Sequence, residues 1–487
     1  MDLHIHLEGR SDLARQIYEQ LRDAILSGRL RRGDRLPPTR QLALRLDVSR
    51  NTVSLAYEWL TSEGFLTGHK GAGSFVDRDS IARSLRARAG VAIRHREIWD
   101  SIDAPAPREQ TARYDFSVGM PDAALFPFDT WRRLLSRQIR PSLLKADYGD
   151  PAGHPKLRAA IARYVAVNRG VIAGADDVLI TNGAQQAFDL IARVLIVPGT
   201  RVVVEEPGYP PPRLLFESLG ARVTAVLVDA SGLDVEELPD DTRLVYVTPS
   251  HQFPLGMPMS HARREALLQW AERRNAILVE DDYDSEFRFG GRPLETLQAI
   301  DRGGRVIYVG SFSKSLLPAL RLGFVIAPAS LQAPLRAASY VAGWYAQWPA
   351  QAALASLIDE GLLARHVRKM RRTYADRHDR ILRTLTANFG KWLVPVPSVT
   401  GMHLAATLRS RSVRLEHEIA KRALAEGIAF DRLSNYCTSD HPRAGVVLGY
   451  GAIAASKIDE GLQRLHECFV RIYAPSPRPT RRGPRSA

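Results

Sequence analysis

Apolar positions recur at helical spacing in the first part of the chain. Four of them, spaced four residues apart, form one stripe: Leu13, Ile17, Leu21 and Ile25. Such a stripe is typical of an amphipathic helix, which Ser11 can cap at its start and Gly28 can end. A shorter helix is expected from Thr39, as its cap, to about Leu46.

A third helix is expected after a tight turn, with Ser49 as its cap. Its buried face consists of Val53, Ala56, Tyr57 and Leu60. Arg50, Asn51 and Thr52 are then exposed at its N-terminal end, where a recognition helix meets DNA. Residues 64–76 predict two short strands around a glycine turn, the pattern of a wing.

Farther along the chain, short β-branched runs alternate with helical patterns. The runs lie at Val178–Ile180, Arg201–Val204, Leu244–Val247, Ile277–Val279, Val306–Val309 and Phe324–Ile326. This alternation predicts a mainly parallel sheet covered by helices. In open sheets of this kind ligands bind at the carboxyl ends of the strands, and most of the chemically suggestive residues follow such a run.

The composition favours a multidomain protein. With 487 residues, 45% of them hydrophobic, the chain can form two or three globular units. It has two cysteines, no apolar run of about 20 residues and no basic-then-apolar leader, so we expect a cytoplasmic protein with reduced thiols. The expected divisions are an N-terminal unit at 1–76, an Arg-rich linker at 77–112, a large domain at 113–472 and a disordered basic tail at 473–487.

The net charge of +14 does not by itself identify a partner. Residues 1–76 hold 11 Lys and Arg against 9 Asp and Glu, so the N-terminal unit is barely basic. The linker holds most of its charge as arginine, which is typical of a solvated segment and also compatible with DNA contact. Only the motifs of the N-terminal unit indicate DNA binding.

Three motifs follow one another in this unit. They are LPPTRQLA at Leu36–Ala43, VSRNTV at Val48–Val53 and GAGSFV at Gly71–Val76. Together they resemble the GntR-type winged helix-turn-helix over residues 10–76. The resemblance implies contacts with double-stranded DNA by Arg40, Ser49, Arg50, Asn51 and Thr52, with a wing tip at Lys70 and Gly71 and a phosphate contact from Arg35.

Lys314 lies in the run SFSKSLLPALR, from Ser311 to Arg321. A lysine that forms a Schiff base with an aldehyde needs a lowered pKa, which burial and the neighbouring cation Arg321 can provide. Ser311 and Arg321 flank the lysine at spacings that allow a hydroxyl and a guanidinium to hold a phosphate. The run is therefore suited to a phosphorylated aldehyde cofactor.

Several acids follow the strand expected at Ile277–Val279, in the segment Glu280–Phe287. A buried acid needs a cation, a metal or a ring nitrogen as its partner. We expect Asp281 to keep a pyridine nitrogen protonated and Tyr283 to donate to the phenolic oxygen of the same ring. A Mg²⁺ or Ca²⁺ cluster is the alternative, but no second acidic loop has suitable spacing, so no metal is assigned.

A third element, TNGAQQAF at Thr181–Phe188, joins a strand to a helix. Free N–H groups at a helix start, beside a glycine, can hold a phosphate. Tyr209 can stack on a cofactor ring and Tyr148 is a similar candidate, although both positions also suit an ordinary core or surface tyrosine.

Together these elements resemble the fold-type I aminotransferase domain over residues 113–470. The resemblance implies an α/β fold with a mainly parallel sheet, helices on both faces and a smaller C-terminal α/β subdomain. It implies pyridoxal 5'-phosphate (PLP) as the cofactor, carried by Lys314 as a Schiff base, with Asp281 on the pyridinium and Tyr283 on the phenolate oxygen. The phosphate would be held by Ala184, Gln185, Ser311, Ser313 and Arg321, with Tyr148 reaching it from a partner subunit.

A GntR-like head before such a domain is identified as the arrangement of the MocR class of regulators. The resemblance implies a head-to-tail homodimer with domain-swapped heads that binds an operator. PLP, or PLP with a small amine or amino acid, would be the signal, and genes of vitamin B6 or amino-acid metabolism would be targets.

Two departures favour a sensor over an enzyme. Phe253, within TPSHQFPLG, stands where aminotransferases have an asparagine. The segment Gly445–Gly451 lacks the arginine that binds a substrate's α-carboxylate. Arg443 is close enough to substitute from the preceding loop, but a solvated loop arginine is the favoured interpretation. Losing that bidentate pair weakens amino-acid binding by roughly a few kcal/mol. An active aminotransferase with an accessory DNA-binding domain, and a scaffold that no longer binds PLP, are the alternatives.

Overall fold

The structure is a computed structural model in which the chain divides into two compact units, Met1–Arg96 and Glu97–Ala487. It describes residues 5–7, 9, 12–30, 33–69, 73–76, 94–103, 112–143, 147–290, 295–343, 347–439 and 442–474. The wing tip at Lys70 and Gly71, the linker residues 77–93 and 104–111, and the tail from residue 475 lie outside the described residues, as do the predictions made for them. No helix of the described part is long and apolar enough to cross a membrane.

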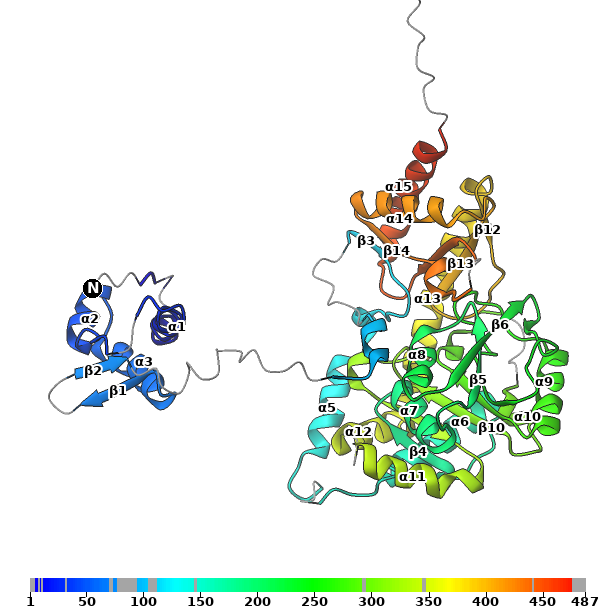
Figure 1. The fold of residues 1–487 in the computed structure, drawn as a ribbon, viewed down its shortest axis with the longest axis horizontal. Coiled ribbons are helices and arrows are strands. Elements are labelled where there is room, and N and C mark those ends of the chain that lie inside the picture. The colour runs from blue at the N-terminus through cyan, green and yellow to red at the C-terminus, as the bar shows by residue number, and fades with distance from the viewer. Residues whose placement is uncertain are drawn as a thin grey trace, which may run out of the picture. The chain divides into compact units, whose positions relative to one another are not determined.

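The first unit contains three helices and a two-stranded sheet (Figure 1). These are α1 (Leu13–Leu26), α2 (Thr39–Leu46), α3 (Arg50–Ser62), β1 (Leu66–His69) and β2 (Gly73–Val76), with the two strands antiparallel. The predicted stripe of α1 and the predicted face of α3 are confirmed, since both supply the core of the unit. Ser49 caps α3 by accepting a hydrogen bond from the backbone N–H of Thr52 at 3.1 Å.

The helix starts differ in two places from the sequence prediction. Thr39 is the first residue of α2, after Pro38, and not its cap. The start of α1 is preceded by Asp12, whose side chain makes no capping hydrogen bond, and Ser11 lies outside the described residues. Neither difference moves the helices, because their buried faces and not their caps fix them in the core.

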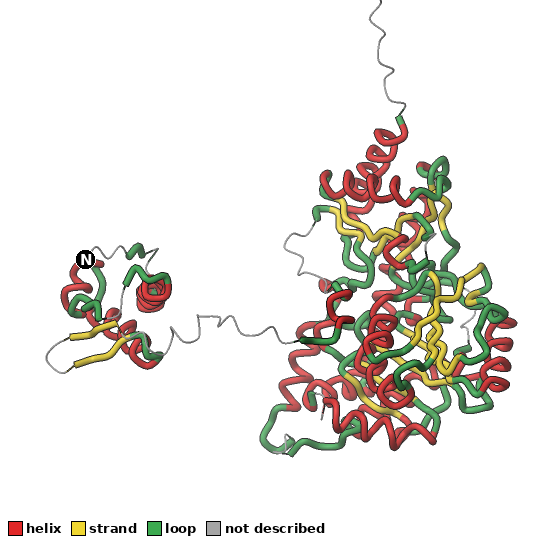
Figure 2. The backbone as a smooth tube through the Cα atoms, in the orientation of Figure 1, coloured by secondary structure: helices red, strands yellow, loops and turns green. Residues whose placement is uncertain are grey.

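The second unit is built on an eight-stranded sheet with the order β4-β11-β10-β9-β8-β5-β6-β7 (Figures 1 and 2). The strands are β4 (Val178–Thr181), β5 (Arg201–Glu206), β6 (Arg222–Asp229), β7 (Gly232–Leu233), β8 (Thr242–Val247), β9 (Ile277–Asp282), β10 (Val306–Ser311) and β11 (Gly323–Ile326). All six predicted strands are present, and four neighbouring pairs are parallel. β11 runs antiparallel to β10 and β4, which the sequence did not indicate.

Helices cover both faces of this sheet, because successive residues of a strand point to opposite sides. Val202 and Val204 pack on one side with α7 (Ala184–Leu195), whereas Val203 packs on the other with α9 (His261–Arg274). Also on the two faces or beside them are α6 (Pro155–Arg169), α8 (Pro210–Ser218), α10 (Leu297–Ile300), α11 (Ala329–Gly343) and α12 (Trp348–Asp359), with α5 (Phe128–Gln138) against α12. Both faces are therefore buried, as a parallel sheet requires.

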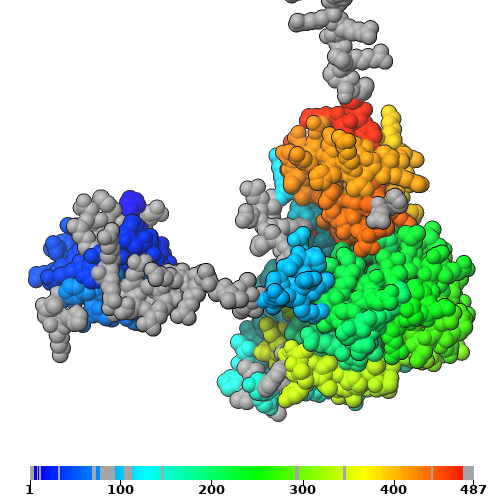
Figure 3. All heavy atoms as spheres, viewed as in Figure 1, coloured from blue at the N-terminus to red at the C-terminus, as the bar shows by residue number. Residues whose placement is uncertain are grey.

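A second, five-stranded sheet has the order β12-β13-β15-β14-β3. Its strands are β3 (Tyr114–Phe116), β12 (Leu393–Pro395), β13 (His403–Leu408), β14 (Ile428–Arg432) and β15 (Gly445–Gly449). It packs with α13 (Leu362–Asn388), α14 (Val413–Ala425) and α15 (Ala455–Tyr473), and these C-terminal elements rest on the central part of the unit (Figure 3). The smaller subdomain is therefore not purely C-terminal, since β3 joins it in parallel with β14 from before the large sheet.

Candidate functional site

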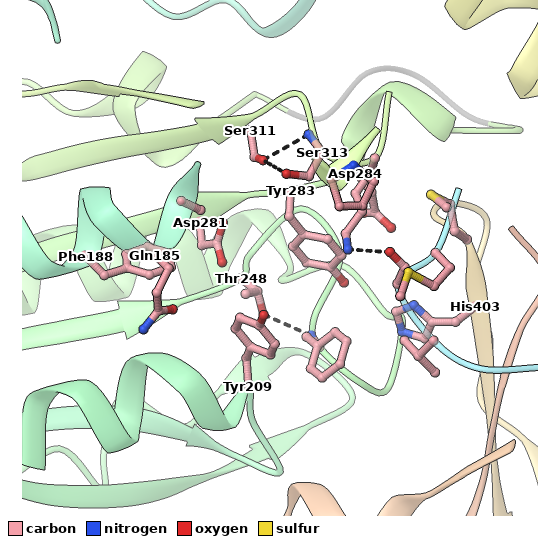
Figure 4. A pocket seen from close by; sticks show the side chains of 18 of the residues that line it. Gln185, Phe188, Tyr209, Thr248, Asp281, Tyr283, Asp284, Ser311, Ser313 and His403 are labelled. Carbon is pink, nitrogen blue, oxygen red and sulfur yellow. Dashed lines mark hydrogen bonds between the residues drawn. The ribbon is translucent and has the colours of Figure 1, made fainter. Parts of the chain in front are cut away.

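A cavity of about 370 Å³ lies at the carboxyl edge of the large sheet. Asp281 is near the end of β9 and Ser311 ends β10, and because the two strands are parallel their ends reach the same edge. Lys314 follows Ser311, and the first turn of α7 faces the same space with Gln185, as Figure 4 shows. The volume falls in the range of roughly 300–1,000 Å³ that is usual for small-molecule sites.

Lys314 lies inside this cavity. Its Nζ donates a hydrogen bond to the carbonyl oxygen of Gly119 at 2.6 Å. Burial lowers the pKa of Lys314, and the nearby carboxyls of Asp284 and Asp281 oppose this shift. Of the two causes expected from the sequence, burial is therefore the one that lowers this pKa, and Arg321 is not among the groups that shift it. A lowered pKa raises the fraction of neutral amine, the form that reacts with an aldehyde.

Asp281 has one oxygen engaged and one without a partner. The hydroxyl of Tyr246 donates to Oδ2 at 2.6 Å, whereas Oδ1 is buried and has no hydrogen-bond partner among the described residues. Burial raises the pKa of Asp281 to about 7. A buried acceptor without a partner costs free energy, so this oxygen suits a ligand that brings an N–H donor into the cavity.

Hydroxyl, backbone and guanidinium groups gather at another part of the cavity. Ser311 Oγ accepts from the backbone N–H of Ser313 at 3.1 Å and donates to Ser313 Oγ at 3.0 Å. Arg321 donates to the carbonyl of Asn182 at 2.8 Å, and a Cβ on Gly183 would come within 3.0 Å of its guanidinium. Gly183 also has a φ of +82°, a conformation that favours glycine, and it precedes the first turn of α7, whose N–H groups can bind an anion.

The tyrosines differ in their placement. Tyr209 lines the cavity with its ring 5.1 Å from that of Phe253, and burial raises its pKa to about 12. Tyr283 also lines it, and its hydroxyl donates to the carbonyl of His251 at 2.9 Å. Tyr148 is 68% exposed and does not line the cavity of its own chain. The structure thus gathers every residue proposed from sequence for the cofactor in one cavity, except Tyr148.

The opposite wall was not predicted. It is formed by residues from the side of the small sheet, which we call the small-sheet wall: Val118, Gly119, Met120, Met402, His403 and Tyr436. In Figure 4, His403 lies across the cavity from Gln185 and Phe188. These residues belong to no motif and come from segments separated by almost 300 positions, so only the folded chain brings them together.

The acids of Glu280–Phe287 do not converge on one point. Glu280 accepts two backbone N–H groups at the start of α10, each at 3.0 Å. Asp282 pairs with Arg169 at 2.7 Å, and Asp284 pairs with His251 Nδ1 at 2.8 Å. These three acids thus bind different partners, and among the described residues the acids of the segment do not gather as a carboxylate group that could hold a Mg²⁺ or Ca²⁺ ion.

His251, Asp284 and His403 form one buried group whose possible ligand atoms lie within 4.8 Å of one another. His251 Nδ1 is hydrogen-bonded to Asp284, and His403 Nε2 lies 3.0 Å from the carbonyl oxygen of Pro254. Burial lowers the pKa of His403 well below its usual value. The group is thus a hydrogen-bonded side-chain cluster with a neutral His403 at the cavity. None of its members was singled out from the sequence.

The structure also shows where Phe253 and Arg443 lie, the two residues discussed for the departures from the aminotransferase pattern. Phe253 lines the cavity and packs against Tyr436 with ring centroids 5.0 Å apart. Arg443 donates to the carbonyl oxygen of Val228 at 2.7 Å and does not line the cavity. Its guanidinium is already engaged, so it does not stand in for the missing arginine in this conformation.

In the first unit, Arg50 and Asn51 are exposed, as expected, and Arg35, Arg40 and Ser49 are exposed too. Thr52 was expected to be exposed as well, but it is partly buried. Its hydroxyl shares a 2.7 Å hydrogen bond with Ser49 Oγ, because the capping geometry draws both side chains over the helix start. Of the two, Ser49 remains the more accessible.

Comparison with known proteins defines the class. The "Bacterial regulatory proteins, gntR family" model matches residues 13–76, and the "Aminotransferase class I and II" model matches residues 115–445. The chain belongs to the MocR class of transcriptional regulators, in which a GntR-type DNA-binding domain precedes a PLP-dependent aminotransferase-like domain. The family, the fold class and the cofactor expected from sequence are thereby confirmed.

Individual relatives extend over nearly the whole chain. It is 39% identical over 465 residues, 94% of each chain, to the "Probable rhizopine catabolism regulatory protein MocR" of Rhizobium meliloti. It is 33% identical over 482 residues, 94% of this chain and 96% of the relative, to the "HTH-type transcriptional regulator TauR" of Rhodobacter capsulatus.

Among solved structures, kynurenine aminotransferase of Pyrococcus horikoshii in complex with PMP matches with a TM-score of 0.70 and 26% identity, over 81% of this chain and 99% of that one. LysN of Thermus thermophilus, complexed with N-(5'-phosphopyridoxyl)-L-leucine, matches with a TM-score of 0.67 and 28% identity, over 74% of this chain and 92% of LysN.

Proposed function

We propose that this protein is a homodimeric regulator whose binding to an operator depends on PLP, alone or with a second small ligand. The observation that carries the proposal is the cavity in which Lys314, Asp281, Ser311 and Arg321 meet. This constellation lies in a chain that also presents an exposed, Ser49-capped helix start in a separate unit. Because its target is DNA, we place the protein in the cytoplasm.

The cavity residues fit PLP group by group. Lys314 Nζ would hold the cofactor covalently, and the partnerless Oδ1 of Asp281 would accept from its ring nitrogen. Tyr209 would stack on the ring, and Tyr283 would turn its hydroxyl from His251 toward the phenolic oxygen. The bound cofactor supplies an electron-withdrawing ring and an aldehyde that reacts with amines.

The phosphate would lie where serines, backbone N–H groups and a guanidinium converge. The contributing residues are Ala184, Gln185, Ser311, Ser313 and Arg321. A guanidinium and several neutral donors form short charge-assisted hydrogen bonds with a dianion. Tyr148, exposed in its own chain, would reach the phosphate of a second copy in a head-to-tail dimer with domain-swapped heads.

Contact with DNA would come from α3 and its surroundings. Arg50 and Asn51 would meet base edges or phosphates, Arg40, Ser49 and Thr52 would fix the helix on the duplex, and Arg35 would contact a phosphate. The wing tip, Lys70 and Gly71, would enter the minor groove. Regulation then requires PLP, or its complex with a second ligand, to bind one geometry of the dimer more tightly than another.

An electrophoretic mobility-shift experiment on the protein's own promoter region, with and without PLP, tests this function. We expect a specific shift that resists competitor DNA and whose midpoint changes on addition of PLP. Absence of a specific shift in both conditions would contradict the proposal. Genes of vitamin B6 or amino-acid metabolism beside that promoter are the targets we propose.

A further inference from the structure

The two walls of the cavity differ in charge. Among the lining residues that the structure describes, the formally charged ones are Asp281, Asp284, Lys314 and Arg321, and all four belong to the side of the large sheet. The small-sheet wall is apolar and aromatic apart from backbone groups and His403. Burial and the neighbouring His251 keep His403 neutral by lowering its pKa well below the usual range.

In the proposed complex with PLP, both described cations of the cavity contact the cofactor. Lys314 holds the aldehyde carbon, and Arg321 lies beside Ser311 and Gly183 at the phosphate end. Asp281 is matched by the ring nitrogen. What remains for a second ligand is the small-sheet wall together with Asp284, which is 1% exposed and held by His251.

Two arginines near the small sheet, Arg377 and Arg443, have guanidinium groups that are engaged elsewhere. Arg377 donates to the carbonyl oxygens of Tyr450 and Gly451 and pairs with Asp122 at 2.5 Å. Arg443 donates to the carbonyl oxygen of Val228 at 2.7 Å. Each of these bonds would have to break before the guanidinium could meet a ligand.

Among the described residues paired on the strand face that carries His403 there is no lysine or arginine. Residues directly opposite on antiparallel strands lie on the same face, and Val447 is opposite both Ala405 and Asp431. Val447 and Ala405 pack in an apolar cluster with Leu255. Asp431 accepts a hydrogen bond from the backbone N–H of Val118 at 2.8 Å, so the charged group on this face is an acid.

We propose that the second ligand is a primary amine with an apolar body and no carboxylate. This inference rests on the proposed function and deepens it by naming the chemical class of the ligand. The apolar body contacts Met120, Met402 and Tyr436, and the amine enters the cavity beside Asp284. A carboxylate attached to the same carbon would be desolvated next to an acid and a neutral imidazole, with no described cation to pair it.

Matched ligand pairs on the PLP-saturated full-length protein test the proposal. The probes are 2-phenylethylamine against L-phenylalanine and 3-methylbutylamine against L-leucine, which differ only by the carboxylate. Visible absorption of the bound cofactor and binding of the promoter DNA are the two readouts. We expect each amine to change the absorption and the DNA binding at a concentration at least tenfold lower than the amino acid with which it is paired. Equal or better response to the amino acid, or no response to any of the four, overturns the proposal.

A charge variant provides an independent check. Met120 lines the cavity and is 47% exposed, so an arginine fits there without burial of its guanidinium. Met120→Arg should reduce the preference for amine over amino acid at least threefold, whereas Met120→Gln, of similar size but uncharged, should leave it unchanged. A ratio that is the same in both variants contradicts the inference.

The two proposals fail in different ways. If the function itself is wrong, the promoter shift or the cofactor absorption is missing before any ligand is added. If only the ligand class is wrong, the promoter shift and the cofactor absorption are both present, and the amines act at no lower concentration than the amino acids.

Discussion

Lys314 Nζ donates to the carbonyl oxygen of Gly119 over 2.6 Å, which joins the segment after β10 to the loop after β3. The first segment belongs to the large sheet and the second leads out of the small sheet. If Lys314 carried the cofactor as proposed, its nitrogen would have a new substituent and this bond would not persist unchanged. Occupancy of the lysine would then be coupled to a contact between the two sheets, which would give the cavity a physical route to alter the conformation of the domain.

Replacement of the lysine should abolish covalent attachment of the cofactor. We expect Lys314→Ala to lose the visible absorption seen after mixing with PLP, and to gain no cofactor mass after borohydride reduction. The exposed Lys391 lies outside the cavity lining, and Lys391→Ala is the control that should behave as the unaltered protein. Persistence of the reduced adduct in Lys314→Ala would place the attachment site at another lysine.

Asp281→Asn should have opposite effects on stability and on cofactor binding. The pKa of Asp281 is about 7 in the folded, cofactor-free protein, against about 4 for an unfolded chain. As the pH rises from about 4 to 7, the unfolded chain loses this proton first, so the folded state loses stability over that range. The asparagine variant carries no such proton and avoids the loss.

Thermal unfolding and PLP titration at several pH values measure both effects. Without PLP, we expect Asp281→Asn to be more stable than the unaltered protein at pH 8 by roughly 1–4 kcal/mol, with the difference disappearing near pH 4. With PLP, its affinity should fall at least tenfold, because the ring nitrogen loses its carboxylate. A variant that keeps full affinity for PLP would remove Asp281 from the proposed site.

Arg50→Ala should weaken binding to the promoter. Its side chain is exposed at the start of α3, and loss of one base or phosphate contact costs about 1–3 kcal/mol, which is roughly a fivefold to hundredfold loss of affinity. Arg15→Ala on α1 is the control, since Arg15 makes an exposed pair with Glu19 that contributes little to stability. Fluorescence anisotropy at one fixed salt concentration compares the two, and equal losses would mean that α3 is not the reading helix.

Steady transamination should be absent. The described cavity holds no arginine beyond Arg321, which we assign to the phosphate, so the substrate carboxylate lacks the pair that orients it. We expect no continuous formation of oxo acid from a panel of amino acids and oxo-acid acceptors, as followed by chromatography. Turnover at about 1 per second or faster, the range of ordinary enzymes, would favour the aminotransferase alternative.

Much of the site could be predicted because its residues are local to recognisable strands. The runs at Val178–Ile180, Ile277–Val279 and Val306–Val309 are continuous and apolar, so both the strands and the residues that follow them could be identified. Parallel strands deliver their carboxyl ends to one edge, and this places Asp281 and Lys314 in a common cavity without knowledge of the detailed packing. The same holds for Ser49, whose capping role depends only on the next three residues.

Other features depended on contacts between residues far apart in the chain. The sequence shows an acidic segment, but only the folded chain assigns Asp282 to Arg169 and Asp284 to His251, and leaves one oxygen of Asp281 without a partner. It also could not decide which of the two expected causes, burial or the cation Arg321, lowers the pKa of Lys314, and in the folded chain that cause is burial. The desolvation of a group depends on all the residues that pack around it, and a local sequence pattern does not show which residues these are.

The sequence by itself thus determined where six strands lie along the chain, which lysine to propose for the cofactor and which helix to propose for the DNA contacts, because periodicity and spacing are local properties. The tertiary structure alone decided what Lys314 faces. β3 leaves its neighbours in sequence to pair with β14, and this brings Gly119 to the lysine and Met120 to the cavity beside His403. That wall, to which we assign the proposed ligand selectivity, exists only because chain segments about 300 residues apart share one small sheet.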